Sequence, residues 1–407
     1  MVWNQQESEA TRPRVWLVMG TRPEAIKLAP VAGAIAAAGR MEPYLVATGQ
    51  HPTMVGQALE TFGVRADATL PLHRRDGGQP ELLGQMLTGL DALADRELPA
   101  VVVVQGDTTT TLAGTLAAFW RRVPVVHLEA GLRSFDLASP FPEELNRRLV
   151  TQAASLHLPP TSAAAGNLLR EQVPAERIVV TGNTSVDAIR AIADRGAVAY
   201  QDERVAAAVE AATRGERLVL VTAHRRESWG EPLRQVLRAV TELVARHTDM
   251  HVVLPAHPNP AVRELVDDEL GGLPRVVVTE PLRYEELAGV LAAATLVLSD
   301  SGGIQEEAPT FGVPVLVLRE VTERMEAVHA GCARLVGTDR ELIVRTASEL
   351  LTDRRARAAM MINGNPFGDG RAASRTERAL ARLLGMSAEP VEEFDADSRV
   401  VAGGVLV

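Results

Sequence analysis

Acidic residues lie at three points of the chain where an apolar run or a loop ends. Asp107 follows the apolar run VVVVQ, Glu129 ends the run PVVHLE, and Glu143 and Glu144 lie in the motif PFPEELNR. Taken alone, Asp107 could equally be the N-cap of a helix. Glu143 and Glu144 could equally serve to complement a helix dipole, because acidic residues in the first helical turn do so. Carboxylates gathered at one edge of a sheet, however, can divide general-acid and general-base work. Together they therefore favour acid–base chemistry.

Two basic residues follow the first apolar run in the motif MGTRPEAIK, where a glycine turn leads into an expected helix. Free backbone N–H groups at such a helix start can face an anion, and Arg22 and Lys27 add positive charge. Lys27 is the only lysine in the chain, and a lysine ammonium does not substitute for a guanidinium where a compact charge is needed. With one glycine and no Walker spacing, the motif is a weak phosphate signature.

A second polar group follows the apolar runs of the C-terminal half. His224 and Arg225 lie in TAHRRES, and His257 lies in LPAHPNP. A lone histidine is more often structural than catalytic, but His224 stands beside two guanidinium groups, where an anionic ligand could bind. The motif therefore adds a candidate anion contact to the C-terminal half.

The motif SDSGGIQEEAP is the strongest local signal. Ser301, Gly302 and Gly303 open a helix directly after an apolar run, and Glu306 and Glu307 follow. Small residues allow a ligand to approach the backbone, and a helix N-terminus suits a diphosphate. A carboxylate further along could bind the two hydroxyls of a ribose. This pattern predicts a nucleoside diphosphate site in a C-terminal domain, with polar chemistry supplied by the N-terminal half across a cleft.

Several cofactor signatures are missing from the sequence. The nine histidines lack zinc-protease spacing, no GxGxxG follows the first apolar run, and no G-x-S-x-G is present. We therefore expect neither a metal nor a nicotinamide cofactor.

Short apolar runs alternate with alanine- and leucine-rich segments along the whole chain. The runs predict strands at 14–19, 43–48, 100–105, 124–128, 156–158 and 177–181, and at 217–222, 251–255, 275–279, 295–299, 314–318 and 333–336. Most are wholly apolar, as in parallel strands buried on both faces. Two sets of six strands favour an α/β fold of two Rossmann-like, doubly wound domains facing across a cleft. Twelve strands are too many for a single (β/α)₈ barrel.

Length and charge limit the classes of function. The chain has 407 residues, a net charge of −10 and 46% hydrophobic residues, which fits a multi-domain globular protein. The acidic balance argues against nucleic-acid and anionic-membrane partners. One cysteine excludes an intrachain disulfide, and no apolar run is long enough to span a bilayer. We expect a cytoplasmic protein.

In combination, the motifs resemble one family, the non-hydrolysing UDP-N-acetylglucosamine 2-epimerases. GTRPEAIKLAP, TGQH, GDTTTTLAG, HLEAGLRS, PEELNR, GNTSVDA, TAHRRES and SDSGGIQEEAP follow the family's order over roughly residues 14 to 375. The resemblance implies a GT-B fold. We accordingly divide the chain into a flexible N-terminus (1–13), an N-terminal domain (14–184), a UDP-binding domain (185–365), a helix crossing back to the first domain (366–386) and a disordered acidic tail (387–407).

The resemblance also implies an activity and a homodimer. The enzyme would interconvert UDP-GlcNAc and UDP-ManNAc without a cofactor, by anti elimination of UDP to 2-acetamidoglucal followed by re-addition. Its implied catalytic residues are Asp107, Glu129, Glu143 and His224. Its implied substrate contacts are Arg22, Lys27, Arg133, Ser301, Gly302, Gly303, Glu307 and Arg324, with Glu307 at the ribose and Arg324 on the nucleotide side.

One departure from the family concerns regulation. Many bacterial members bind a second UDP-GlcNAc as an activator, and Gln50, Arg225 and His257 match that region. Thr53, however, stands where a second glutamine is usual, so we expect activation to be weak or absent.

Two other activities remain open. A hydrolysing 2-epimerase would release UDP and ManNAc from the same intermediate. A GT-B glycosyltransferase would instead require an acceptor and would not exchange the C2 proton.

Overall fold

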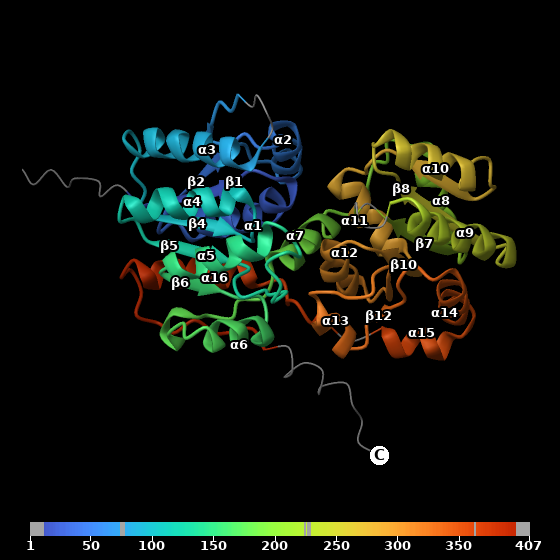
Figure 1. Ribbon diagram of the computed structural model, residues 1–407. Coiled ribbons are helices and arrows are strands. Elements are labelled where there is room, and N and C mark those ends of the chain that lie inside the picture. Colours follow the sequence, from blue (N-terminus) through green and yellow to red (C-terminus); the bar gives the residue numbers. More distant parts are fainter. Residues whose placement is uncertain (1–11, 74–77, 224, 226–228, 362–363, 396–407) are drawn as a thin grey trace, which may run out of the picture. The chain divides into compact units, whose positions relative to one another are not determined.

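The computed structural model describes residues 12–73, 78–223, 225, 229–361 and 364–395 (Figure 1). The chain divides into two compact units, which we describe separately. The N-terminal unit contains the chain up to Pro159 together with Ala164–Val179 and Ala373–Glu393, and the C-terminal unit contains the remainder. Each unit holds a six-stranded parallel sheet with helices on both sides, which confirms the predicted fold class.

The N-terminal sheet has the strand order β3-β2-β1-β4-β5-β6. Its strands are β1 (Arg14–Met19), β2 (Glu42–Ala47), β3 (Ala68–Thr69), β4 (Val101–Gln105), β5 (Val125–Leu128) and β6 (Leu156–Leu158). Its helices are α1 (Arg22–Ala38), α2 (Pro52–Thr61), α3 (Gln79–Ala94), α4 (Thr109–Trp120), α5 (Glu143–Ala153), most of α6 (Ser162–Arg170) and almost all of α16 (Ala372–Leu383). The strand order reverses between β1 and β4, which is where doubly wound sheets bind ligands.

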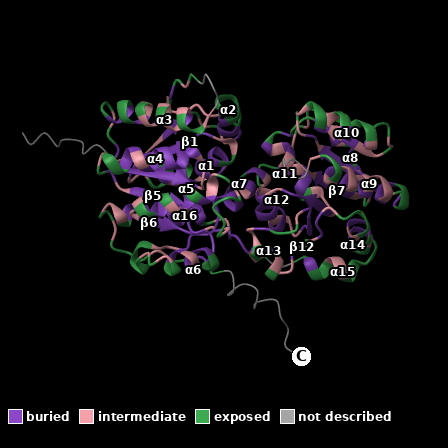
Figure 2. Ribbon diagram, in the orientation of Figure 1, coloured by how far each residue is buried: buried purple, intermediate pink, exposed green. Residues whose placement is uncertain are grey.

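The strands of this sheet are buried on both faces, and Figure 2 shows them as purple ribbon. Successive side chains of a strand point to opposite faces. On β1, Trp16 and Val18 therefore join the core beneath α3 and α4, while Leu17 and Met19 point to the other face. The absence of hydrophobic–polar alternation in these runs follows directly from this burial.

The C-terminal sheet has the order β12-β11-β10-β7-β8-β9. Its strands are β7 (Arg217–Thr222), β8 (Met250–Pro255), β9 (Val276–Thr279), β10 (Leu296–Ser299), β11 (Val315–Val317) and β12 (Ala333–Leu335). Its helices are α7 (Thr184–Ala193), α8 (Glu203–Thr213), α9 (Glu231–Arg246), α10 (Pro260–Leu270), α11 (Tyr284–Ala293), α12 (Gly302–Glu307), α13 (Met325–His329), α14 (Arg340–Thr352) and α15 (Arg354–Met360). The order reverses between β7 and β10, so each unit has one such reversal point.

Two details of the predicted strands are wrong. The run 177–181 is not a strand: Arg177 ends a short 3-10 helix, and only Ile178 pairs with β6, as an isolated bridge to His157. The sixth strand of the N-terminal sheet is instead β3, whose two residues are too few to show any hydrophobic period.

The last described residues of the chain, α16 and 387–395, are packed against the rest of the protein. Within the N-terminal unit, the Arg40 guanidinium donates two hydrogen bonds, of 3.0 and 2.6 Å, to Glu377 of α16. We expected disorder from Ser387 onward, but the structure describes residues 387–395, and Phe394 is buried with its N–H bonded to the Val180 carbonyl. Within the described residues, no helix is long and apolar enough to cross a membrane.

Candidate functional site

The first cluster of the N-terminal unit centres on Glu129, directly after β5. Its Oε2 atom accepts hydrogen bonds from the Lys27 ammonium of α1 and from the Gln105 amide at the end of β4, the latter at 2.6 Å. All three residues are buried. A buried ion pair needs further hydrogen bonds to satisfy its carboxylate, and Gln105 supplies one. The structure thus joins the only lysine of the chain to a predicted catalytic carboxylate.

The backbone of Glu129 has an unusual conformation for a glutamate. Its φ angle is +61°, in the left-handed region. Its N–H nevertheless bonds to the Leu158 carbonyl of β6 at 3.0 Å, so the turn is anchored to the sheet. Left-handed residues other than glycine cost free energy and gather at functional sites, which agrees with the predicted importance of Glu129.

The second cluster is built on Asp107, in the loop after β4. Its Oδ2 atom accepts from Arg147 Nε at 2.8 Å and lies 2.6 Å from Arg147 Nη2. The Asn146 side chain donates to the Asp107 carbonyl at 2.9 Å. Two consecutive residues of α5 therefore hold both the side chain and the backbone of Asp107.

A buried histidine, His127, holds the same loop by a hydrogen bond to its backbone. His127 of β5 shares a 2.7 Å hydrogen bond with the carbonyl of Gly106, and neutral Nε2–H is the donor. Burial is the main cause that lowers the pKa of His127 to about 3, so the ring is neutral at physiological pH. Gly106 has a φ of +72°, which favours glycine. His127 therefore positions the turn that presents Asp107.

The two glutamates of PEELNR differ in their surroundings. Glu144 is fully buried and accepts from the Ser134 N–H, Arg147 and Arg148. Burial raises the pKa of Glu144, but these hydrogen bonds and charges outweigh it and lower the pKa overall. Glu144 is thus a structural anchor of α5. Glu143, half-buried at the start of α5, remains the candidate for chemistry.

A further carboxylate, Glu24, was not predicted as a site residue. Its Oε2 atom accepts from the N–H groups of Gly20 and Thr21 at 2.9 and 2.7 Å, and its Oε1 atom accepts from Thr108 Oγ1 at 2.6 Å. Burial raises the pKa of Glu24, although all these hydrogen bonds act to lower it. Glu24 therefore ties the turn before α1 to Thr108, the N-cap of α4, and the anion contact at this helix start stays a prediction.

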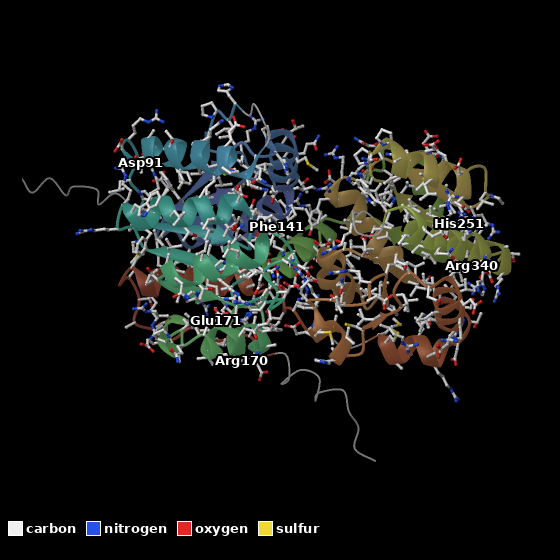
Figure 3. All side chains as sticks on the ribbon, viewed as in Figure 1. Asp91, Phe141, Arg170, Glu171, His251 and Arg340 are labelled. Carbon is white, nitrogen blue, oxygen red and sulfur yellow. The ribbon has the colours of Figure 1, made fainter. Side chains whose placement is uncertain are left out.

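Arg133 was expected to contact substrate, but the structure gives it a different partner. Its side chain is 0% exposed and pairs with Glu171, which lies directly after α6 (Figure 3). It also donates to Thr151 Oγ1 and to the Leu132 carbonyl. All these contacts lie inside the N-terminal unit, so we correct its role to a structural one that ties the loop after β5 to α5 and α6.

Two more predicted residues lie near the β1 reversal point. Arg22 is the first residue of α1 and is half-buried. The Gln50 side chain accepts from Thr110 Oγ1 of α4 at 2.9 Å. Gln50 is therefore connected to the start of α4, the helix that follows the Asp107 loop.

The reversal point of the C-terminal unit joins the loops after β7 and β10. The Arg225 N–H donates to Asp300 Oδ2 at 2.9 Å, and Arg225 Nε donates to the Asp300 carbonyl at 3.1 Å. His224 lies outside the described residues. His257 follows β8, where its ring lies 5.4 Å from the ring of Trp229 and accepts from the Asn259 N–H. The structure thus places Arg225 at the reversal point and His257 beside Trp229.

The loop after β10 leads into α12 at Ser301, Gly302 and Gly303. A Cβ atom added to Gly302 would lie 2.9 Å from the guanidinium carbon of Arg324, so an alanine here would require the Arg324 side chain to shift. Arg324 in turn donates to Glu306 at 3.0 Å. The first N–H groups of a helix have no acceptor within it. This turn therefore offers backbone donors beside a guanidinium.

Glu307 ends α12 and is buried. The hydroxyl of Tyr284, the first residue of α11, donates to Glu307 Oε1 at 3.0 Å. Tyr284 therefore orients the carboxylate that we expected at the ribose.

Sequence reasoning missed six residues that hold the predicted ones or the turns beside them: Glu24, Gln105, His127, Asn146, Arg147 and Tyr284. Only Glu24 had a local signal, because Thr21 and Glu24 have the T-x-x-E spacing of a capping box. The other five bond to residues that are more than 20 positions away in the sequence. Among the described residues, no group of three or more His, Cys, Asp or Glu side chains could hold a metal ion.

Comparison with known proteins identifies relatives over almost the whole chain. The family described as UDP-N-acetylglucosamine 2-epimerase matches residues 33–381. The UDP-N-acetylglucosamine 2-epimerase of Escherichia coli K12 is 44% identical over 370 residues, which are 90% of this chain and 98% of the relative.

Solved structures agree with this result. The UDP co-structure of Staphylococcus aureus MnaA has a TM-score of 0.86 at 40% identity and covers 94% of this chain and all of that one. The Neisseria meningitidis UDP-GlcNAc 2-epimerase bound to UDP-GlcNAc has a TM-score of 0.85 at 37% identity, covering 91% and 100%. The family match, the identities and the shared two-sheet fold lead to one conclusion: this chain belongs to the UDP-N-acetylglucosamine 2-epimerase family.

Proposed function

We propose that this enzyme interconverts UDP-GlcNAc and UDP-ManNAc by the non-hydrolysing route, without a cofactor. The observation that carries the proposal is the pair of carboxylates at neighbouring strand ends. Asp107 follows β4 and binds Arg147, and Glu129 follows β5 and binds Lys27. Inversion at C2 needs two acid–base groups, and this sheet edge supplies two held in fixed positions.

The proposed reaction conserves atoms and electrons without an oxidant. A base removes the C2 proton, the C1–O bond breaks with its electron pair leaving on UDP, and a C1–C2 double bond forms in 2-acetamidoglucal. A proton is then added to the opposite face of C2, and the UDP oxygen re-forms the bond to C1. Asp107, Glu129 and Glu143 are our candidates for these proton transfers.

Residues of the C-terminal unit would retain UDP between the two steps. We assign the diphosphate to Ser301, Gly302 and Gly303, since this turn presents backbone N–H donors. We assign the ribose to Glu307 and the nucleotide side to Arg324, and we keep His224 near the diphosphate. The S. aureus and N. meningitidis relatives, solved with UDP and with UDP-GlcNAc, support a uridine nucleotide as ligand.

We also propose a homodimer. Leu145 and Leu149 of α5 are exposed and four residues apart, so they fall on one helix face, and Phe141, just before α5, is exposed as well (Figure 3). Light scattering on the purified protein should give twice the chain mass, and Leu145→Glu combined with Leu149→Glu should reduce it. A monomeric wild-type protein would contradict this proposal. The cytoplasmic location stays a prediction.

Substrate activation should be weak or absent, because Thr53 replaces the usual second glutamine. Velocity should therefore rise hyperbolically with UDP-GlcNAc concentration. A clearly sigmoidal curve that Gln50→Ala abolishes would contradict this.

The test of the reaction is proton NMR of UDP-GlcNAc with the purified protein in D₂O and no added cofactor. Deuterium at C2 together with a UDP-ManNAc signal would support the proposal. Free UDP with ManNAc would identify the hydrolysing reaction instead. An unchanged spectrum would contradict the proposal and direct attention to acceptor-dependent glycosyl transfer.

A further inference from the structure

We propose that Gln105 is a positioning residue that holds the Glu129 carboxylate in place for proton transfer at C2. This inference rests on the proposed function and assigns a role to a residue that the motifs did not single out. Gln105 does not need to touch the substrate, because it acts through Glu129.

The contact itself is short and buried. Gln105 Nε2 donates to Glu129 Oε2 at 2.6 Å, and Gln105 is only 4% exposed. The same oxygen accepts from the Lys27 ammonium. Oε2 is therefore held by one charged and one neutral donor.

Lys27 alone would hold Glu129 poorly. Its ammonium is a point charge at the end of a flexible four-carbon stem, so it follows the carboxylate as readily as it restrains it. Gln105 is the last residue of β4, which is hydrogen-bonded to β1 on one side and β5 on the other. Its carbonyl also accepts from Thr111 Oγ1 at 2.6 Å. The amide thus projects from a fixed backbone and can define where Oε2 lies.

Glu129 needs such a restraint because its own backbone leaves the regular strand. At a φ of +61°, the side chain is no longer directed by the pleat of β5. The register pairs Gln105 with Leu128, the residue before Glu129, so the amide is placed beside the point where the chain turns.

The chemistry of the amide suits this place. A glutamine side chain donates a hydrogen bond but does not ionise in the physiological range. It can therefore hold a carboxylate that exchanges protons with a substrate without competing for those protons. A carboxylic acid at position 105 would compete, and a thioether would supply no donor.

The variants Gln105→Met and Gln105→Glu test the proposal in the full-length protein. Methionine keeps the length of the side chain and removes the donor, and an ionised glutamate replaces the donor with a second acceptor. We expect kcat for UDP-GlcNAc epimerisation to fall about tenfold or more, the usual effect of losing a hydrogen bond to a charged group. KM should change less than about twofold, since Gln105 does not contact UDP. The matched control is Gln85→Met on α3, whose half-buried amide bonds to His73 and Glu81.

A readout independent of activity comes from the single lysine. Protein grown with ¹⁵N-labelled lysine has one side-chain amine signal, that of Lys27. In Gln105→Met this signal should shift and its hydrogens should exchange faster with water, because Glu129 is held less firmly. Gln85→Met should leave it unchanged.

The outcomes separate the two proposals. A folded Gln105 variant with wild-type kcat, or an unchanged Lys27 signal in Gln105→Met, would overturn the role of Gln105. An inactive wild-type protein would overturn the proposed reaction alone, and the Lys27 signal would still decide whether Gln105 holds Glu129.

Discussion

Two buried histidines predict that the N-terminal unit loses stability at mildly acidic pH. His127 of β5 and His157 of β6 are paired in the sheet and are 0% and 1% exposed. Burial, with a smaller effect of nearby charges such as Arg133, lowers the pKa of His127 to about 3 and that of His157 to about 4, from an ordinary 6.5. Because the unfolded chain binds these protons more readily than the folded one, stability is complete above the ordinary pKa and falls as the pH drops below it.

The size of the loss follows from the unfolded state. At pH 5 both rings are still neutral in the folded protein, while the unfolded chain has gained almost two protons. pH 5 lies about 1.5 units below the ordinary pKa, and each unit is worth about 1.36 kcal/mol. Each histidine therefore lowers the free energy of unfolding by about 2 kcal/mol. The sum of about 4 kcal/mol is a large part of the roughly 5–15 kcal/mol that stabilises a typical domain.

The assay is urea unfolding at pH 7.5 and pH 5, followed by tryptophan fluorescence in a Trp229→Phe background. Of the remaining tryptophans, Trp16 and Trp120 belong to the N-terminal unit, and Trp3 lies outside the described residues. His127→Gln keeps a donor for the Gly106 carbonyl but removes the titrating group, so its loss between the two pH values should be about half that of the parent. His73→Gln, at an exposed position, should match the parent. An equal loss in His127→Gln and the parent would refute the reasoning.

Four further predictions concern the site, and all use steady-state kinetics with UDP-GlcNAc. Asp107→Asn should lower kcat about 100-fold or more, as loss of an acid–base group does. Arg147→Lys should lower kcat about tenfold, because the Asp107 carboxylate loses its contact with two guanidinium nitrogens. Near-native turnover in either variant would show that the changed residue does not take part in catalysis. Tyr284→Phe should raise KM several-fold with little change in kcat, since Glu307 loses its donor, and an unchanged KM would argue against the ribose assignment. Gly302→Ala should raise KM about tenfold, because the added methyl would force the Arg324 guanidinium, our expected nucleotide contact, to move. A wild-type KM would argue against the role of Arg324.

The predictable part of the site consists of residues at the ends of apolar runs. Asp107, Glu129 and the turn at Ser301 could be found because a buried parallel strand is visible as an apolar run, and its carboxyl end is where ligands bind. Lys27 stood out by its rarity. Each of these signals lies within about ten residues of sequence.

The partners of those residues were not predictable in the same way. Arg147 meets Asp107 across 40 positions, and Gln105 meets Glu129 across 24. Such pairs depend on how helices and strands pack, and an arginine or glutamine in one sequence does not indicate its partner. The same limit explains Arg133, whose motif suggested a ligand while its burial beside Glu171 is a property of the fold.

The wrong strand has a related cause. Residues 178–181 are all β-branched, which favours a strand. Beyond the bridge at Ile178, however, the backbone of Val180 accepts from Phe394 instead of a strand neighbour. Phe394 is more than 200 residues away in the sequence, so the local pattern could not show that it binds the Val180 carbonyl in place of a neighbouring strand.

The position of Glu24 has a consequence for selectivity between ligands. This side chain lies at the starts of both α1 and α4, where it bonds the Thr21 N–H and the Thr108 hydroxyl, at positions where doubly wound folds usually bind phosphate. A phosphate at this reversal point would have to displace the hydrogen bonds of Glu24, whereas a neutral ring such as a sugar would not. Inorganic phosphate and free nucleotides should accordingly compete for the C-terminal unit alone, so an inhibitor aimed at the N-terminal unit should be an uncharged sugar mimic.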